Sequence, residues 1–157
     1  MAVAEAILDR GGASLSDGAG PSVLSCAIVN EQVDMVRFLL ERGASTEHSD
    51  DPSVPPLVLA CMSAASSPRS ADLALLLLVH GANPSHCSRS QIYPVHAAHD
   101  CPRVLRELIR RGVDVNVKNR FGKTPLQFAL ENKVPASIAL LRQAGAEEPP
   151  QAACVVG

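Results

Sequence analysis

The sequence predicts an all-α solenoid, in which pairs of helices stack side by side, and two repeating landmarks predict this fold. Along the 157 residues, four segments carry an apolar pair followed by a glycine that suits the end of a helix. These glycines are Gly43, Gly81, Gly112 and Gly145, which stand 38, 31 and 33 residues apart. Thirteen residues after the first three come Pro56, Pro94 and Pro125, each followed by an aliphatic residue. Two landmarks at a fixed offset indicate an internal repeat of one helix pair.

Each landmark suits a helix for a physical reason. Proline fits the first helical position, because the amide hydrogen that it lacks would have no partner there. Thr124, immediately before Pro125, adds a hydroxyl that can cap the free amides of the first turn. Pro102 and Pro135 mark the starts of second helices in the same way. Small residues at a matching position allow the first helices to approach closely, and these are Ala27, Ala60, Ala98 and Ala129.

Residues 119–129, which read NRFGKTPLQFA, resemble the ankyrin repeat, whose hallmark is a T-P-L-H-x-A helix start in a unit of about 33 residues. Residues 93–98 and 55–60 are weaker copies of this motif, and residues 22–27 are the most divergent. The resemblance covers residues 17–148 and implies helix-turn-helix units joined by short β-hairpins or loops. Hairpin starts fall at Asp17, Asp50, Ser88 and Asn119.

The resemblance divides the chain into one ankyrin repeat domain, residues 1–148, and a flexible C-terminal tail, residues 149–157. Within the domain we expect a partial capping repeat over residues 1–16 and four repeats. The repeats span about residues 17–49, 50–87, 88–118 and 119–148. The second has about five extra residues between its helices, at 63–70, and the third is about two residues short near Asp100. The polar insertion is either a tolerated surface loop or a contact or phosphorylation loop, since Ser67 precedes Pro68.

Composition excludes several classes of function. The 14 basic side chains against 16 acidic ones give a formal charge of −2, which leaves no basic surface for nucleic acid. The longest strongly apolar run, residues 73–79, is far shorter than the roughly 20 residues of a membrane-spanning helix. Five cysteines, odd in number and unclustered, indicate reduced thiols and therefore the cytoplasm, the nucleus or both. We expect neither a nucleic-acid nor a membrane partner.

Histidine and cysteine gather between residues 80 and 101, but their spacing fits no closed zinc site. His99 and Cys101 could form a thiolate pair, yet no acid that would orient the histidine is evident. No glycine-rich phosphate loop is present either. We therefore expect no enzyme activity, no metal and no cofactor. The alternative, a metal- or thiol-dependent enzyme, rests only on this gathering of histidine and cysteine.

The resemblance implies that the chain binds another protein through its hairpin tips and the outer side of its first helices, which form a concave surface in ankyrin repeats. Placed on the repeat pattern, ten residues fall on that surface: Asp51, Val54 and Met62 in the second repeat, Arg89, Ile92 and Asp100 in the third, and Arg120, Phe121, Lys123 and Glu131 in the fourth. An aromatic residue beside an arginine, as at Phe121, is the composition of an interface hot spot. The alternative for Phe121 is lateral packing against the neighbouring hairpin.

The sequence thus predicts a non-catalytic protein–protein interaction module, either an adaptor or a substrate-recognition scaffold, which acts as a monomer or within a hetero-complex. The alternative is an ankyrin-type inhibitor of a protein kinase such as a cyclin-dependent kinase. Residues 119–124 are similar to a stretch of such inhibitors, in which it belongs to an earlier repeat.

Two modification sites are also predicted. The context of Asn116, which follows Leu108, resembles that in which ankyrin repeats are hydroxylated on asparagine. The alternative for Asn116 is a structural role, in which the side chain stabilises its own turn. The second predicted site is Ser67, as a target of phosphorylation.

Overall fold

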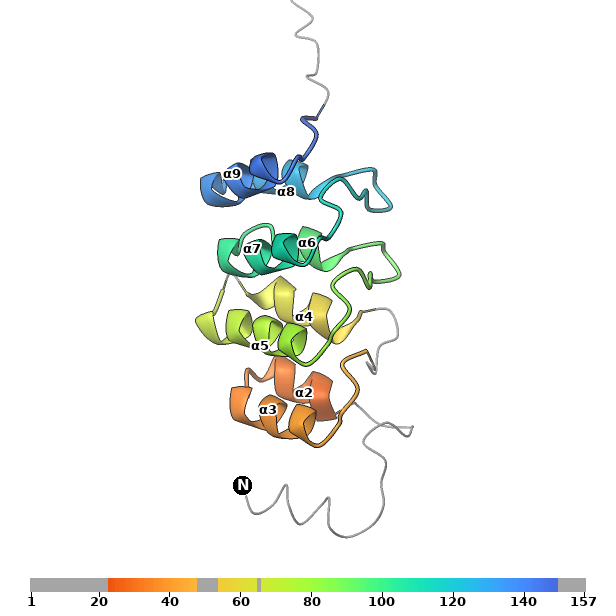
Figure 1. The fold of residues 1–157 in the computed structure, drawn as a ribbon, viewed down its shortest axis with the longest axis vertical. Helices are drawn as coiled ribbons and strands as arrows, with labels where there is room; N and C mark the ends of the chain where they lie inside the picture. The colour runs from red at the N-terminus through yellow and green to blue at the C-terminus, as the bar shows by residue number, and fades with distance from the viewer. Residues whose placement is uncertain (1–22, 48–53, 65, 150–157) are drawn as a thin grey trace, which may run out of the picture.

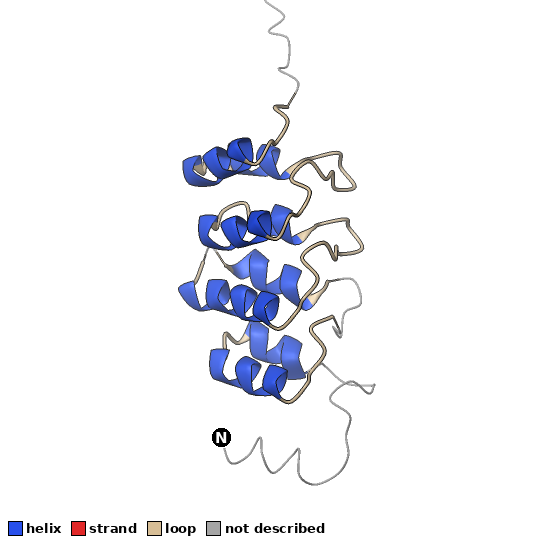
Figure 2. Ribbon diagram, in the orientation of Figure 1, coloured by secondary structure: helices blue, strands red, loops and turns tan. Residues whose placement is uncertain are grey.

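The computed structural model describes residues 23–47, 54–64 and 66–149. These residues form eight helices, and none of them belongs to a strand (Figure 2). The helices are α2 (Val23–Val29), α3 (Val33–Glu41), α4 (Pro56–Ser63), α5 (Pro68–Val79), α6 (Pro94–Ala97), α7 (Pro102–Arg110), α8 (Pro125–Glu131) and α9 (Pro135–Gln143). Among the described helices, none is both long and apolar enough to cross a bilayer. The predicted cap, Asp17, Asp50 and residues 150–157 of the predicted tail lie outside the described residues.

The helices pair consecutively, and the four pairs stack in one row (Figure 1). We name α2–α3, α4–α5, α6–α7 and α8–α9 units one to four. First helices contact the first helices of adjacent units, and second helices contact second helices, so the stack has two layers. The connections from unit two to unit three and from unit three to unit four project to one side, on the right in Figure 1. This is the all-α solenoid that the sequence predicts, whereas the exact repeat boundaries stay predictions.

Equivalent apolar residues fill the space between the units. Four alanines in or immediately after the first helices, Ala27, Ala60, Ala98 and Ala129, are at most 1% exposed, so adjacent helices approach closely. Four leucines that share one place in the second helices, Leu39, Leu77, Leu108 and Leu141, are at most 2% exposed. Because each unit buries its apolar surface only against its neighbours, stability is close to a sum of nearest-neighbour terms.

Prolines and glycines take the helix-end positions that the sequence predicts. Pro102 and Pro135 begin α7 and α9. The four helix-ending glycines, Gly43, Gly81, Gly112 and Gly145, have φ between 77° and 87°, which glycine adopts without strain. At the start of α8, Thr124 Oγ1 accepts from the Gln127 amide at 3.4 Å, and the Thr124 amide donates to Gln127 Oε1 at 2.8 Å. This reciprocal capping box satisfies two amides that the helix itself leaves free.

Unit two corrects one sequence-based expectation. The extra residues do not form a long loop over residues 63–70, because α4 continues to Ser63 and α5 already begins at Pro68. Most of them lengthen helices: α5 has 12 residues where α3, α7 and α9 have 9, and α4 has 8 where α2 and α8 have 7. The unrecognised signal was Pro68 itself, which is a proline at a first helical position like Pro102. Ser67 caps α5 by accepting from the Arg69 amide at 3.2 Å.

Candidate protein-binding surface

Two of the projecting connections are described in full at their tips, and they share one geometry. We name Ser88–Ile92 finger three and Asn119–Lys123 finger four. In each finger the amide of the first residue donates to the carbonyl of the last, at 2.9 Å in finger three and 3.0 Å in finger four. The amide of the fourth residue donates back to the carbonyl of the first, at 2.8 Å in both. The chain therefore makes the same closed turn twice.

Finger four is the more firmly closed of the two. The Asn119 side-chain oxygen accepts from the amides of Phe121 at 2.9 Å and Lys123 at 3.0 Å. In finger three Ser88 Oγ accepts one such bond, from the Ile92 amide at 3.1 Å. An asparagine at the first position thus fixes two amides of its turn, and a serine fixes one.

The fourth residue of each finger has positive φ, and this conformation is less strained in finger four. It is Gly122 in finger four, with φ of 74°, and Gln91 in finger three, with φ of 54°. Glycine pays no steric cost in this region, whereas a residue with a side chain does. Finger four therefore presents its tip in a preorganised conformation, which reduces the entropy lost on binding.

The tip of finger four displays the predicted aromatic–arginine pair. Phe121 is 68% exposed, and the guanidinium carbon of Arg120 lies 4.6 Å from the centre of its ring. This exposure does not fit the alternative in which Phe121 packs laterally against the neighbouring finger. At the same positions finger three has Arg89, which is exposed, and Ser90, which is half-buried. An aromatic platform is therefore present on finger four and not on finger three.

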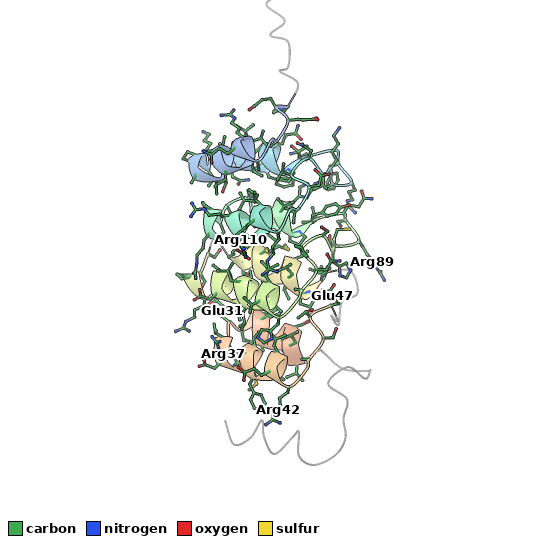
Figure 3. All side chains as sticks on the ribbon, viewed as in Figure 1. Glu31, Arg37, Arg42, Glu47, Arg89 and Arg110 are labelled. Atoms are coloured by element: carbon green, nitrogen blue, oxygen red, sulfur yellow. The ribbon has the colours of Figure 1, made fainter. Side chains whose placement is uncertain are left out.

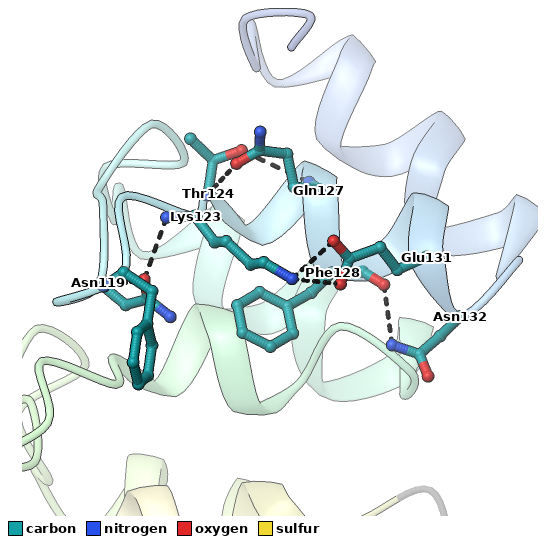
Figure 4. Close-up of polar contacts among 8 residues, drawn as sticks. Asn119, Lys123, Thr124, Gln127, Phe128, Glu131 and Asn132 are labelled. Atoms are coloured by element: carbon teal, nitrogen blue, oxygen red, sulfur yellow. Dashed lines mark hydrogen bonds and ion pairs between the residues drawn. The ribbon is translucent and has the colours of Figure 1, made fainter. Parts of the chain in front are cut away.

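Lys123 and Glu131, two further predicted binding residues, are paired with each other (Figure 4). Lys123 Nζ donates to the two Glu131 oxygens at 2.7 and 2.8 Å and lies 5.8 Å from the centre of the Phe128 ring. Both charged side chains are about half exposed, at 42% and 51%. Such pairs contribute only about 0–1 kcal/mol to stability. A partner could therefore share or replace this pair at small cost.

Aromatic rings meet where units three and four join. The ring centre of Phe128 lies 5.7 Å from that of His96 and 5.5 Å from that of His99. The repeat pattern alone did not indicate Phe128 and His99 as part of this surface. A usable signal exists for Phe128, because it lies three residues before Glu131 on α8 and so shares its helix face.

His96 is a structural residue of this junction. It is 1% exposed, its Nδ1 accepts from the Tyr93 amide at 3.3 Å, and its Nε2 lies 3.0 Å from the Lys123 carbonyl, to which it donates. Burial lowers the pKa of His96 below its usual value, although the carbonyl contact acts in the opposite direction. The neutral ring therefore links unit three to finger four.

The other predicted surface residues are less uniform. Met62 is 60% exposed, whereas Val54 and Ile92 are half-buried and pack against the core. Asp100 is also half-buried, and its Oδ1 has no hydrogen-bond partner among the described residues. Asp51 lies outside the described residues. A binding role for these residues stays a prediction.

Comparison with known proteins agrees with the stacked helix pairs. No protein-family model matches the chain. The chain is 31% identical to cyclin-dependent kinase 4 inhibitor B of Bos taurus over 122 residues, which cover 74% of this chain and 87% of the bovine protein. It is also 47% identical, over 53 residues, to an ankyrin repeat protein of fowlpox virus (strain NVSL); that match covers 32% of this chain and 7% of the viral protein. The chain is an ankyrin-repeat protein.

In this ankyrin-repeat protein, side chains at one repeat position join the end of one unit to the next. Asn116 Oδ1 accepts from the Glu147 amide at 2.7 Å, and Asn116 Nδ2 donates to the Gly145 carbonyl at 3.1 Å. Glu47, at the same place in unit one, accepts from the Asn83 amide at 2.8 Å. These contacts give Asn116 a structural role between units, and its hydroxylation stays a prediction.

The histidines and cysteines of the ankyrin array do not converge. Within the part of the chain that the structure describes, no three His, Cys, Asp or Glu residues are placed to hold a metal ion. Burial raises the pKa of the Cys61 thiol, and nearby Cys101 and Asp100 raise it further, so the thiol stays protonated. His99 Nδ1 lies 2.7 Å from the His96 carbonyl, so the ring is already engaged with the backbone.

Proposed function

We propose that the chain is a non-catalytic interaction module that binds a protein partner through fingers three and four and the adjacent side of the first helices. It serves as an adaptor or a substrate-recognition scaffold in the cytoplasm, the nucleus or both. The observation that carries this proposal is the exposed ring of Phe121, stacked with Arg120 on a firmly closed turn. Aromatic and arginine side chains contribute most of the energy at many interfaces.

The free energy available on binding favours finger four as the main contact with the partner. Complete burial of a phenylalanine side chain contributes about 1.5–3 kcal/mol, and most of this is available here because Phe121 is 68% exposed in the free protein. The hydrogen bonds to Asn119 hold the tip before any partner arrives. Little ordering of the backbone is then needed on binding.

The test is replacement of Arg120 and Phe121 by alanine, compared with replacement of Arg89 and Ser90 by alanine in finger three, which has no aromatic ring and should reduce capture less. We expect the finger-four variant to lose partner capture in quantitative affinity purification from native lysate. Its thermal melting, followed by circular dichroism, should barely change because both side chains are exposed. Undiminished capture would place the partner on another surface. A comparable loss of helical signal would instead give Phe121 a structural role.

A second candidate function, a protein kinase inhibitor, is supported by the similarity to an inhibitor of cyclin-dependent kinase 4 over most of both chains. Purified cyclin-dependent kinase 4 with its cyclin is the direct reagent. Inhibition that depends on the amount of added protein, together with co-purification, would support this function. Absence of both binding and inhibition would eliminate it for this kinase and leave the adaptor proposal standing.

A further inference from the structure

The outward side of α5 differs from that of the other second helices. Counting back from the helix-ending glycine makes positions comparable between units. Six residues before it stand Arg37, Leu75, Arg106 and Ala139. Two residues before it stand Glu41, Val79, Arg110 and Gln143. Units one and three have charged residues at both positions, whereas unit two has Leu75 and Val79.

Apolar residues surround the whole of α5 in its C-terminal half. Its inner side is formed by four buried residues, Leu73, Ala74, Leu77 and Leu78. On its outer side Leu75 and Leu76 are half-buried, with part of each side chain packed against the core, and Val79 is 74% exposed. Leu75 and Val79 are four residues apart and share one face of the helix. We name Leu75, Leu76 and Val79 the α5 strip. Single exposed apolar side chains are common, but a helix that is apolar all round is normally covered.

The helix beside the α5 strip is strongly basic. In a chain of net charge −2, four of the 14 basic side chains lie on α7 and at its C-terminal end, namely Arg103, Arg106, Arg110 and Arg111. Arg110 and Arg111 donate to Glu107 at 2.8 Å, and Arg103 pairs with Asp72 of α5 at 2.7 Å. The hydrogen bonds from Arg110 and Arg111 lower the pKa of Glu107 to about 2. Two acids, Glu107 and Asp72, thus face four arginines, which leaves a net positive surface next to the strip.

The excess of positive charge lies on one side of α5 only. Figure 3 shows Arg37 on α3 and Arg110 on α7, with α5 between these two helices in the stack. On α3 and at its C-terminal end, Arg37 and Arg42 are balanced by two acidic residues, Asp34 and Glu41. The apolar strip is thus bordered by mixed charge towards unit one and by arginines towards unit three.

We propose that the outer face of α5 and α7 docks an amphipathic helix of a protein partner, which places apolar side chains on the α5 strip and acidic side chains against the arginines of α7. Charge complementarity selects this occupant, because the strip offers apolar contact and α7 an excess of positive charge. A second copy of the chain fits less well, since the same face of that copy would bring its own excess of arginines against α7. This surface lies on the second helices and does not depend on the finger site.

Two synthetic peptides test the proposal against the full chain. Both are fluorescently labelled amphipathic helices with leucines at positions i, i+3, i+4 and i+7; one has glutamates beside the leucines and the other has lysines. In fluorescence anisotropy we expect the full chain to bind the glutamate peptide and to bind the lysine peptide at least tenfold more weakly. Arg106→Glu, at an exposed position, should weaken binding of the glutamate peptide several-fold.

The decisive variant combines Leu75→Arg with Val79→Glu, which introduces the residues that unit one has at these positions and should therefore preserve the helix. We expect at least a tenfold loss of affinity for the glutamate peptide. The matched control combines Ala139→Arg with Gln143→Glu, the same two residues at the same positions of unit four, and should bind like the wild type. Circular dichroism of both variants checks that the helices are retained.

Several results would overturn the proposal. These are absence of binding of the glutamate peptide, equal binding of the two peptides, and equal affinity of the wild type and the strip variant. Sedimentation velocity could reveal a dimer that the strip variant abolishes, which would assign the face to a second copy. Phosphatidylserine vesicles bound by the wild type and not by the strip variant would assign it to a membrane instead. A variant with Arg120 and Phe121 replaced by alanine should retain peptide binding, so failure at the fingers and failure here are distinguishable.

Discussion

Units two and four reach the same fold from different sequences, and they are held in different ways. Unit four is stabilised by a contact within the unit, the capping box of Thr124 and Gln127 at the start of α8. Unit two lacks a side-chain cap on α4. At the start of α5, the capping residue Ser67 is itself hydrogen-bonded to unit one. Glu31 accepts from Ser67 Oγ at 2.9 Å and from Ser70 Oγ at 2.8 Å, and these hydrogen bonds lower the pKa of Glu31. A repeat with a weak motif can therefore be supported by its neighbour.

The same two units also differ on their outward faces. Met62 of unit two and Glu131 of unit four hold the same place on the first helices, and Val79 and Gln143 hold the same place on the second. Unit two is thus apolar on both layers, with Met62 60% and Val79 74% exposed. Unit two therefore offers apolar side chains at two outward positions where unit four offers polar ones.

The largest expected effect tests whether a cavity in an interior unit reduces the free energy of unfolding more than the same cavity in a terminal unit. Leu77→Ala in unit two should reduce the free energy of unfolding by about 2–5 kcal/mol, because it opens a cavity at a fully buried position. Leu141→Ala, at the same position of unit four, should cost less, since unit four has one neighbour among the described units. Urea denaturation measures both, with Leu77→Met as a volume-conserving control that should cost under about 1.5 kcal/mol. Equal losses would contradict nearest-neighbour stability.

A smaller effect should follow from overpacking the first helices. Ala129→Leu should reduce the free energy of unfolding by about 1–3 kcal/mol, because Ala129 is fully buried where α8 approaches its neighbour. Ala60→Leu in unit two should cost at least as much, since α4 has a first helix on both sides. The control is Ala139→Leu, at an exposed position of α9, which should be close to neutral in the same urea titration. A neutral Ala129→Leu would show that α8 has room to move.

The sequence predicts the position of a residue well where that position depends on the local backbone at a helix end. Pro102, Pro135 and the helix-ending Gly112 could be placed because their backbone preferences are local. The sequence does not predict hydrogen bonds whose two residues lie far apart in the chain. The bond from Ser67 to Glu31 joins residues 36 positions apart, and nothing in either segment alone indicates it. The ten predicted binding residues share repeat positions, but packing decided that Val54 and Ile92 are partly covered.

Removal of a helix cap should destabilise unit two more than unit four, because the cap in unit two also contacts unit one. Thr124→Ala removes one cap bond within unit four and should cost about 1 kcal/mol. Ser67→Ala removes the cap of α5 and also the bond to Glu31, so we expect a loss at the upper end of the range for caps, about 2 kcal/mol. Shifts of the urea midpoint measure both, and Ser66→Ala, at an exposed neighbouring position, is the control. If Ser67→Ala cost less than Thr124→Ala, the bond to unit one would add nothing.

Phosphorylation of Ser67 stays a prediction, and the structure defines its expected consequence. A phosphate on the Ser67 oxygen would remove the proton that Glu31 accepts and would place two negative groups together. The connection between α2 and α3, which contains Glu31, should then exchange its amide hydrogens faster. Hydrogen exchange of protein synthesised with phosphoserine at this position would measure it. Unchanged exchange there would show that the Glu31–Ser67 bond does not hold unit one to unit two.

The smallest expected effect extends the comparison to His96, which in unit three takes the place of Gln127 in unit four. The folded pKa of His96 lies below its usual value of 6.5, so the unfolded chain binds more protons once the pH falls below that value. Stability is therefore complete above pH 6.5 and decreases as the pH falls towards the folded pKa of His96. His96→Gln should flatten this part of a profile of urea midpoints against pH, because a glutamine can accept from the Tyr93 amide as Gln127 accepts from that of Thr124. His99 lowers the pKa of His96 further, so the variant His99→Gln should be measured as well, to separate its contribution from that of His96. If wild type and His96→Gln gave parallel profiles, protonation of His96 would not be what weakens the junction of units three and four.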